Sequence, residues 1–322
     1  MVFPTRFLVV GATTLACAVS TAFAQGDYPN RAVRVVVPSS PGGGTDTLTR
    51  RITPAFEKRL GQNVVVDNRP GAGSIIGNEI VAHSKPDGYT LLMGISTLAI
   101  LPATRKKLPY DALKDLAPIT QTVAAPNILV VHPSLPVTTV KQLIAFAKKH
   151  PGELNYASAG PGTNPHLVME LFLNMTDTKM VHIPYKGLGP ALVDLMTGRV
   201  VVASGTMLSS LRYVQDGRLR GLATTGLKRS SALPDLPTVD EAGVKGFDAT
   251  QWYGLFAPAG TPKPIIDKIN RAMVDALRAE SAKFAKDGAD AVGNSPEEFA
   301  RIMQSETVKW GKIVKMAGIT PR

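Results

Sequence analysis

Two glycine-rich segments of the chain have the residue types that bind anions without a charged side chain. Ser39–Asp46 reads SSPGGGTD and Ser158–His166 reads SAGPGTNPH, and each follows an apolar run typical of a β-strand. The glycines let a ligand approach the backbone, and the Thr/Asp or Thr/Asn residues begin a helix whose first N–H groups carry partial positive charge. Each segment therefore predicts a site for a phosphate or a carboxylate. For one segment alone, helix capping by Thr45 or Asp46 is the simpler interpretation.

The presence of two such segments favours ligand binding over simple capping. If they face each other across a cleft, each can hold one end of a ligand. Neither segment contains a Lys or Arg, so backbone amides and hydroxyl groups must supply the binding energy. The candidate ligand-binding residues from the two segments are Ser39, Gly43, Gly44, Thr45, Asp46, Ser158, Gly160, Gly162, Thr163 and His166.

Motifs for catalysis, metal binding and nucleotide binding are incomplete. Tyr156–Gly160 reads YASAG and resembles a nucleophile elbow, but Tyr156 replaces the first glycine. The segment 288–295 has the spacing of a phosphate loop, with Asn294 where the lysine must be. The histidines show no paired metal-ligand spacing. We therefore expect no enzyme activity, no metal and no cofactor, and a secreted hydrolase that uses Ser158 is the alternative.

Strand-like and helix-like segments alternate along the chain, which predicts an α/β fold with mostly parallel sheets covered by helices. Strands are expected at 34–37, 63–68, 89–94, 154–158, 180–185 and 199–204. Two further segments, 118–133 and 247–259, are expected to cross between two lobes. The prediction is a discontinuous lobe I, residues 25–126 plus 249–322, and a lobe II, residues 127–248, joined as a hinged clamp.

The N-terminus has the features of a secretory signal peptide over residues 1–24. A positive start and an apolar stretch precede the small-x-small motif Ala22–Ala24. Cleavage between Ala24 and Gln25 leaves a chain without cysteine, and lipidation of Cys17 is the less favoured alternative. The expected location is therefore outside the cytoplasm.

The chain is basic, with a formal net charge of +11 from 36 Lys and Arg against 25 Asp and Glu. The cations are scattered and form no long run, so nucleic-acid binding is not indicated. A general positive field that attracts small anions is the inference that this charge supports.

Several long motifs, in order and spacing, resemble one known family. They include YPNRAVRVVVPSSPGGGTD, VVVDNRPGAGSIIGNEIVAHSKPDGYTLLMG, LNYASAGPGTNPHL, VHIPYKGLGPALVDLMTGRV and WYGLFAPAGTP. From about Tyr28 to the C-terminus the chain is similar to the extracytoplasmic solute-binding receptors of tripartite tricarboxylate transporters, also called the Bug family.

The resemblance implies a periplasmic, two-lobed binding protein of the Venus-flytrap type that closes on a small organic carboxylate or dicarboxylate. It also implies a monomer that delivers its ligand to the permease subunits of a membrane transporter. A sensory module that docks on a membrane signalling protein needs the same closure and stays open as an alternative. By the same resemblance, further residues complete the wall of the site: Ser96, Thr97, Ser204, Gly205 and Thr206.

Two departures from the family pattern bear on the ligand. Ser39 stands where family members often have an aromatic residue, and Gly205 stands where they often have an acidic one. Loss of the acid removes a partner for an amino group and removes repulsion against a second carboxylate. The expected ligand is a polar acid without an amino group, with two or more carboxylates or hydroxyls.

Overall fold

The structure is a computed structural model that describes residue 1, residues 28–316 and residues 318–321. The expected cleavage site at Ala24–Gln25 and Cys17 lie outside the described residues. Within the described part of the chain, no helix has both the length and the apolar character that a membrane crossing requires.

The strands form one mixed sheet with the order β2-β1-β3-β9-β4-β7-β5-β6. In its first half, β1 (Val33–Val37) lies between β2 (Val64–Asn68) and β3 (Thr90–Ile95), and all three are parallel. In its second half, β5 (Asn155–Ser158) lies parallel to β6 (Val181–Pro184) and to β7 (Val202–Thr206). Each half therefore has the expected parallel core, whereas the strands that join the halves are antiparallel.

The strand β4 (Leu116–Val131) belongs to both halves of the sheet. Its residues 116–126 pair antiparallel with β9 (Thr250–Pro258), which also pairs with β3. Its residues 127–131 pair with β7 and with β8 (Arg220–Thr224), and the short β10 (Asp290–Ala291) pairs with β4 near Val123. One of the two expected crossing segments, 118–133, thus coincides with a strand that changes partners midway.

The second passage between the halves lies at residues 249–250, where the chain enters β9 within the expected segment 247–259, and it is tied to the first passage at Thr225. The backbone N–H of Asn127 donates to Thr225 Oγ1 at 2.8 Å, and Thr225 Oγ1 donates to Ala249 O at 2.6 Å. Two backbone hydrogen bonds, Thr225 N to Asn127 O and Ala249 N to Thr225 O, complete the connection. The two passages therefore lie side by side, as a hinge requires, while the exact lobe limits stay a prediction.

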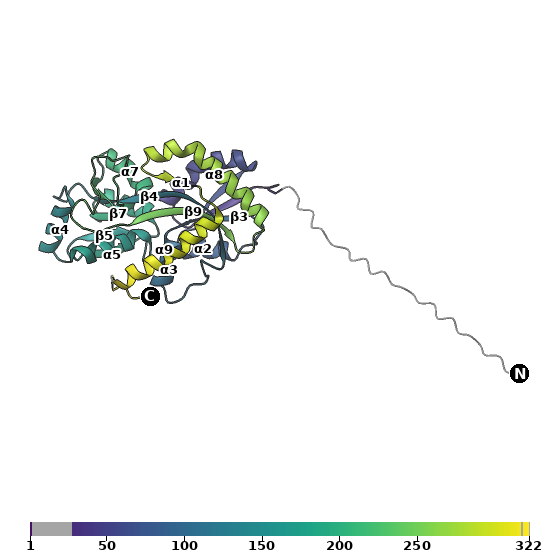
Figure 1. Ribbon diagram of the computed structural model, residues 1–322. Coiled ribbons are helices and arrows are strands. Elements are labelled where there is room, and N and C mark those ends of the chain that lie inside the picture. The colour runs from purple at the N-terminus through teal and green to yellow at the C-terminus, as the bar shows by residue number, and fades with distance from the viewer. Residues whose placement is uncertain (2–27, 317, 322) are drawn as a thin grey trace.

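Helices cover both faces of the sheet (Figure 1). One face packs against α1 (Gly44–Leu60), α6 (Leu188–Met196), α7 (Met207–Gln215) and α8 (Lys263–Lys286). The other packs against α2 (Ile75–Ala82), α3 (Thr97–Thr104), α4 (Val140–Lys149), α5 (Asn164–Thr176) and α9 (Pro296–Met316). Successive side chains of β1 point to opposite faces of the sheet. Val35 packs in the hydrophobic core on the first face and Val36 in the core on the second.

Local sequence signals place several helix ends correctly. Leu48, Ile52 and Phe56 recur at helical spacing and are buried on one side of α1, which ends at Gly61 with a φ of 79°. The α9 helix begins as its Ser-Pro-Glu-Glu start predicts, with the Glu298 N–H donating to Ser295 Oγ at 3.1 Å. The strand expected at 199–204 lies two to three residues later, at β7.

Candidate functional site

A cavity lies between the two halves of the sheet, at the carboxyl ends of their parallel strands. The first half contributes residues 38–45 after β1, residues 71–74 after β2, and Ile95 and Gln251 from β3 and β9. The second half contributes residues 159–165 after β5, residues 186–188 after β6, and Thr206 at the end of β7. Ligands of α/β proteins bind at this edge because the loops and helix N-termini converge there.

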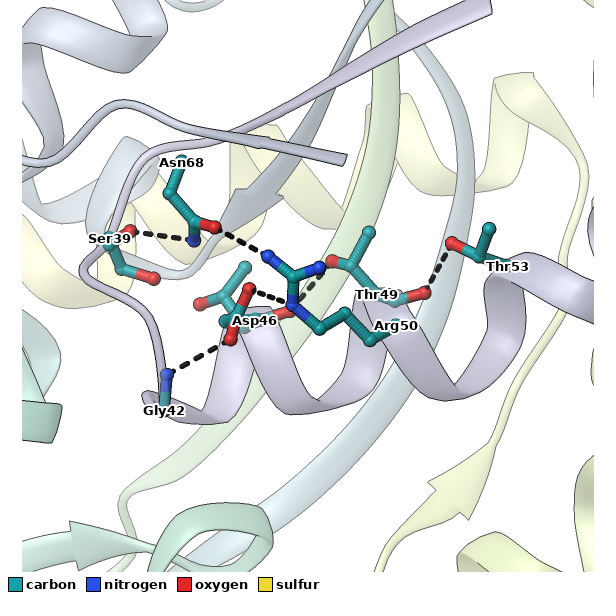
Figure 2. A network of polar contacts seen from close by, with 8 residues as sticks. Ser39, Gly42, Asp46, Thr49, Arg50, Thr53 and Asn68 are labelled. Atoms are coloured by element: carbon teal, nitrogen blue, oxygen red, sulfur yellow. Dashed lines mark hydrogen bonds and ion pairs between the residues drawn. The ribbon is translucent and has the colours of Figure 1, made fainter. Parts of the chain in front are cut away.

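The first glycine segment is held in shape by its own acidic residue (Figure 2). The Asp46 carboxylate accepts from the Gly42 N–H at 2.9 Å and from Arg50 Nε at 2.8 Å. Arg50 also donates to Asn68 Oδ1 at 2.9 Å, and Asn68 Nδ2 donates to Ser39 O at 3.1 Å. Asp46 therefore positions the segment and is paired with a cation, while Ser39, Gly43, Gly44 and Thr45 line the cavity.

The second glycine segment uses most of its polar side chains internally. Thr163 Oγ1 donates to Gly160 O at 2.6 Å, and the Gly162 N–H donates to His166 Nδ1 at 3.3 Å. Of the residues predicted from this segment, Thr163 lines the cavity. Gly160, Gly162 and His166 shape the turn that positions it, and His166 lies on a separate surface hollow.

Ser158, the serine of the YASAG motif, is fully buried below this turn. Its Oγ lies 2.6 Å from His182 Nε2 and accepts from the Gly160 N–H at 3.0 Å. A substrate cannot reach a hydroxyl group in this position, so the Ser158–His182 contact stabilises the turn. The geometry gives no support to the hydrolase alternative.

Helix N-termini surround the cavity. Its lining includes the N-cap residues of α1, α2, α5, α6 and α7, which are Gly43, Ser74, Thr163, Gly187 and Thr206. None of these five helices has a side-chain capping hydrogen bond within the described residues. By contrast, α4 is capped by Thr139 and lies elsewhere. In α5 the Asn164 N–H already donates to Thr97 Oγ1 at 3.4 Å and Pro165 has no N–H, whereas the first N–H groups of the other four helices can face an anion at the cavity.

The other residues predicted for the wall lie behind the cavity, except for Thr206. Ser96 and Thr97 are fully buried, and Thr97 Oγ1 accepts from the Asn164 N–H at 3.4 Å. Ser204 Oγ accepts from Asn127 Nδ2 at 3.1 Å. A Cβ on Gly205 would lie 2.0 Å from Ser210 Oγ, so position 205 faces the core and not the cavity. Gly205 does not contact the cavity, so its identity gives no support to the expected preference for a ligand without an amino group. Ser39, the other departure from the family pattern, does line the cavity.

Three contributions to the cavity were not among the predicted site residues. Gly71–Ser74 is a glycine turn after β2, the same signal that identified the other two segments. Lys186 is the one charged side chain among the described lining residues, and no acidic side chain is among them. Gln251, at the start of β9, carried no local signal, because only the sheet order brings it to the cavity.

Close approaches between loops of the two halves bound the cavity. Arg105 Nη2 donates to Pro161 O at 3.0 Å. A Cβ on Gly44 would lie 2.4 Å from Thr206 Oγ1, and a Cβ on Gly189 would lie 2.4 Å from Pro41 O. Glycine at both positions lets the two halves come together more closely than a side chain would permit.

Two parallel αβ cores, joined by two passages and meeting at a cavity ringed by helix N-termini, define a protein of the periplasmic-binding class. Residues 48–319 match the family model described as the tripartite tricarboxylate transporter family receptor. The chain belongs to this family, as its sequence motifs indicated.

Solved structures of related proteins agree with this assignment. The chain is similar to the periplasmic binding protein BugD, with 32% identity, 92% of this chain and 100% of BugD covered, and a TM-score of 0.89. It is similar to Rpa4515 of R. palustris with adipate, with 37% identity, coverage of 92% and 100%, and a TM-score of 0.89. MatC from Rhodopseudomonas palustris with bound malate gives 32% identity, coverage of 89% and 100%, and a TM-score of 0.82. The predicted two-lobed α/β fold and the solute-binding receptor function are confirmed.

Proposed function

We propose that this receptor captures a small organic carboxylate in the cavity between its lobes and delivers it to the permease of a tripartite tricarboxylate transporter. It acts in the periplasm, after cleavage of the signal peptide near Ala24–Gln25, by closing on the ligand without chemical conversion. The family assignment and the adipate and malate carried by related structures support this proposal.

The observation that carries the proposal is the electrostatic character of the cavity. Among the residues that the structure describes, five helix N-termini without side-chain caps and one lysine, Lys186, line it, and no acidic side chain does. A carboxylate accepts hydrogen bonds only, so it is complementary to clustered N–H donors and partial positive charge. An amino group would find no anionic partner among these lining residues.

The ligand class that we propose is a polar acid with two or more carboxylates or hydroxyls. The two glycine segments lie on opposite halves of the sheet, so each can hold one end of such a molecule. Ser39, in place of an aromatic wall, supplies a hydroxyl group whose oxygen has no protein hydrogen-bond partner among the described residues. Aromatic monoacids and free amino acids should bind more weakly.

A ligand screen by thermal shift tests the proposal. The protein is unfolded, freed of any co-purified ligand, refolded and heated with panels of aliphatic dicarboxylates, aromatic carboxylates and amino acids. Binding stabilises the folded state by RT ln(1 + [L]/Kd), about 2.7 kcal/mol at a hundredfold excess over Kd. An aliphatic di- or hydroxyacid should raise the melting temperature most. A larger shift with an amino acid or an aromatic acid contradicts the proposed ligand class.

A further inference from the structure

The cavity contains a neutral polar group that the proposed binding of carboxylates leaves unused. Gln251 lines the cavity and is only 3% exposed to solvent. Its side-chain Oε1 has no hydrogen-bond partner of normal geometry among the described residues. A buried amide oxygen without a partner is costly, because its hydration is lost and nothing replaces it. A ligand that supplies a hydrogen-bond donor at this point would remove that cost.

A second buried polar group lies next to Gln251 along β9. Tyr253 is two residues further on, so both side chains are on the same face of the strand. Its hydroxyl is fully buried and lies close to the side chains of Thr206 and Gln251, although it makes no hydrogen bond of normal geometry among the described residues. The hydroxyl lies 2.7 Å from the place that a Cβ on Gly44 would take, directly behind the first glycine segment. Burial raises the pKa of Tyr253 to about 12, so its hydroxyl stays protonated and can donate.

The chemistry of this part of the cavity differs from that of the helix N-termini. The Gln251 oxygen is an acceptor, and a carboxylate placed against it would bring two acceptors together. A hydroxyl group can donate a hydrogen bond, so it satisfies an amide oxygen. The part of the ligand that faces β9 should therefore carry a hydroxyl group.

Resting on the proposed carboxylate function, we propose that Gln251 is a specificity-determining residue that accepts a hydrogen bond from a hydroxyl group on the carbon chain of the ligand. The helix N-termini hold the carboxylates, and Gln251 discriminates hydroxylated acids from their deoxy analogues. Sites that hydrogen-bond a ligand hydroxyl reject the analogue that lacks it, because the buried partner is then left unpaired.

The test compares two matched pairs of acids, malate with succinate and 3-hydroxyadipate with adipate, by calorimetric titration of the refolded protein. The wild type should bind the hydroxylated acid of at least one pair tenfold more tightly or better. In Gln251→Met, which keeps the length of the side chain and removes its hydrogen bonding, the ratio should fall to within about twofold. Thr45→Ala is the control, since it should weaken both members of a pair by the same factor and leave the ratio unchanged.

A second variant keeps the test decisive if Gln251→Met does not fold. Gln251→Glu retains an acceptor but adds a negative charge, so both acids should bind more weakly while the preference for the hydroxylated acid persists. Equal binding of both pair members by the wild type, or an unchanged ratio in Gln251→Met, overturns the inference and leaves the carboxylate function standing. Failure of the wild type to bind any of the four acids overturns the proposed function and this inference with it.

Discussion

Substitution of Gly189 should affect ligand affinity without lowering the stability of the ligand-free protein. It is the second residue of α6, and a Cβ there would lie 2.4 Å from the backbone oxygen of Pro41 and 3.3 Å from Ser40 Oγ. Both of these atoms belong to the first glycine segment, on the other half of the sheet. Because the main obstacle is a backbone oxygen, it cannot turn away as the end of a flexible side chain would.

The magnitude of the effect of Gly189→Ala follows from two opposing terms. Within α6, alanine is favoured over glycine by up to about 1 kcal/mol, so the ligand-free protein should be as stable as the wild type or more stable. In the closed arrangement the added methyl group overpacks the contact with Pro41, which costs about 1–3 kcal/mol. If closure accompanies binding, this cost appears in the affinity as a loss of about 5- to 150-fold.

The assay is a pair of measurements on the refolded protein: the melting temperature without ligand, and the Kd for the acid that gives the largest thermal shift. Gly311→Ala is the matched control, since Gly311 is also a helical glycine and a Cβ there meets nothing within 4 Å. The control should keep the wild-type Kd. Wild-type affinity in Gly189→Ala would show that the approach of Gly189 to Pro41 does not belong to the bound state.

Three further outcomes are expected. Thr45→Ala should weaken binding by about 0.5–1.5 kcal/mol in a titration, and loss of all binding in Lys186→Ala with normal binding in Thr45→Ala would contradict the role of the helix N-termini. Saturating ligand should reduce the radius of gyration in small-angle scattering, and an unchanged radius with confirmed binding would count against a moving clamp. Burial raises the pKa of Tyr253 from 10.0 to about 12. The contribution of the protonated hydroxyl to the free energy of unfolding is therefore complete below pH 10 and is lost as the pH rises from 10 to about 12. In denaturant titrations, the free energy of unfolding should fall less between pH 9 and pH 11 for Tyr253→Phe than for the wild type. An equal fall in both proteins would show that the buried Tyr253 hydroxyl is not the cause.

The parts of the fold that the sequence predicted are those that local chemistry decides. The strand, glycine turn and helix around Ser39–Leu60 follow from an apolar run, flexible glycines and an amphipathic pattern that ends at Gly61. The pairing of β4 could not be predicted in the same way. Its 16 residues pair with β9 and then with β7 and β8, whose residues lie about 70 to 140 positions away in the sequence.

The candidate site shows the same division. Gly43, Gly44, Thr45 and Thr163 line the cavity because a glycine turn at a helix start is a local signal. The orientation of a side chain at the end of a strand is not local, so Ser204 is engaged by Asn127 and position 205 faces Ser210. For the same reason no sequence pattern pointed to Gln251.

A crystal structure of the refolded protein with the acid that gives the largest thermal shift shows directly which groups hold the ligand. The acid should lie in the cavity between the lobes. Its carboxylate oxygens should accept from the first backbone N–H groups of α1 and of α6, at about 2.7–3.2 Å. An acid bound outside this cavity, or held by Lys186 alone with the helix N-termini turned away from it, would contradict binding by the helix N-termini.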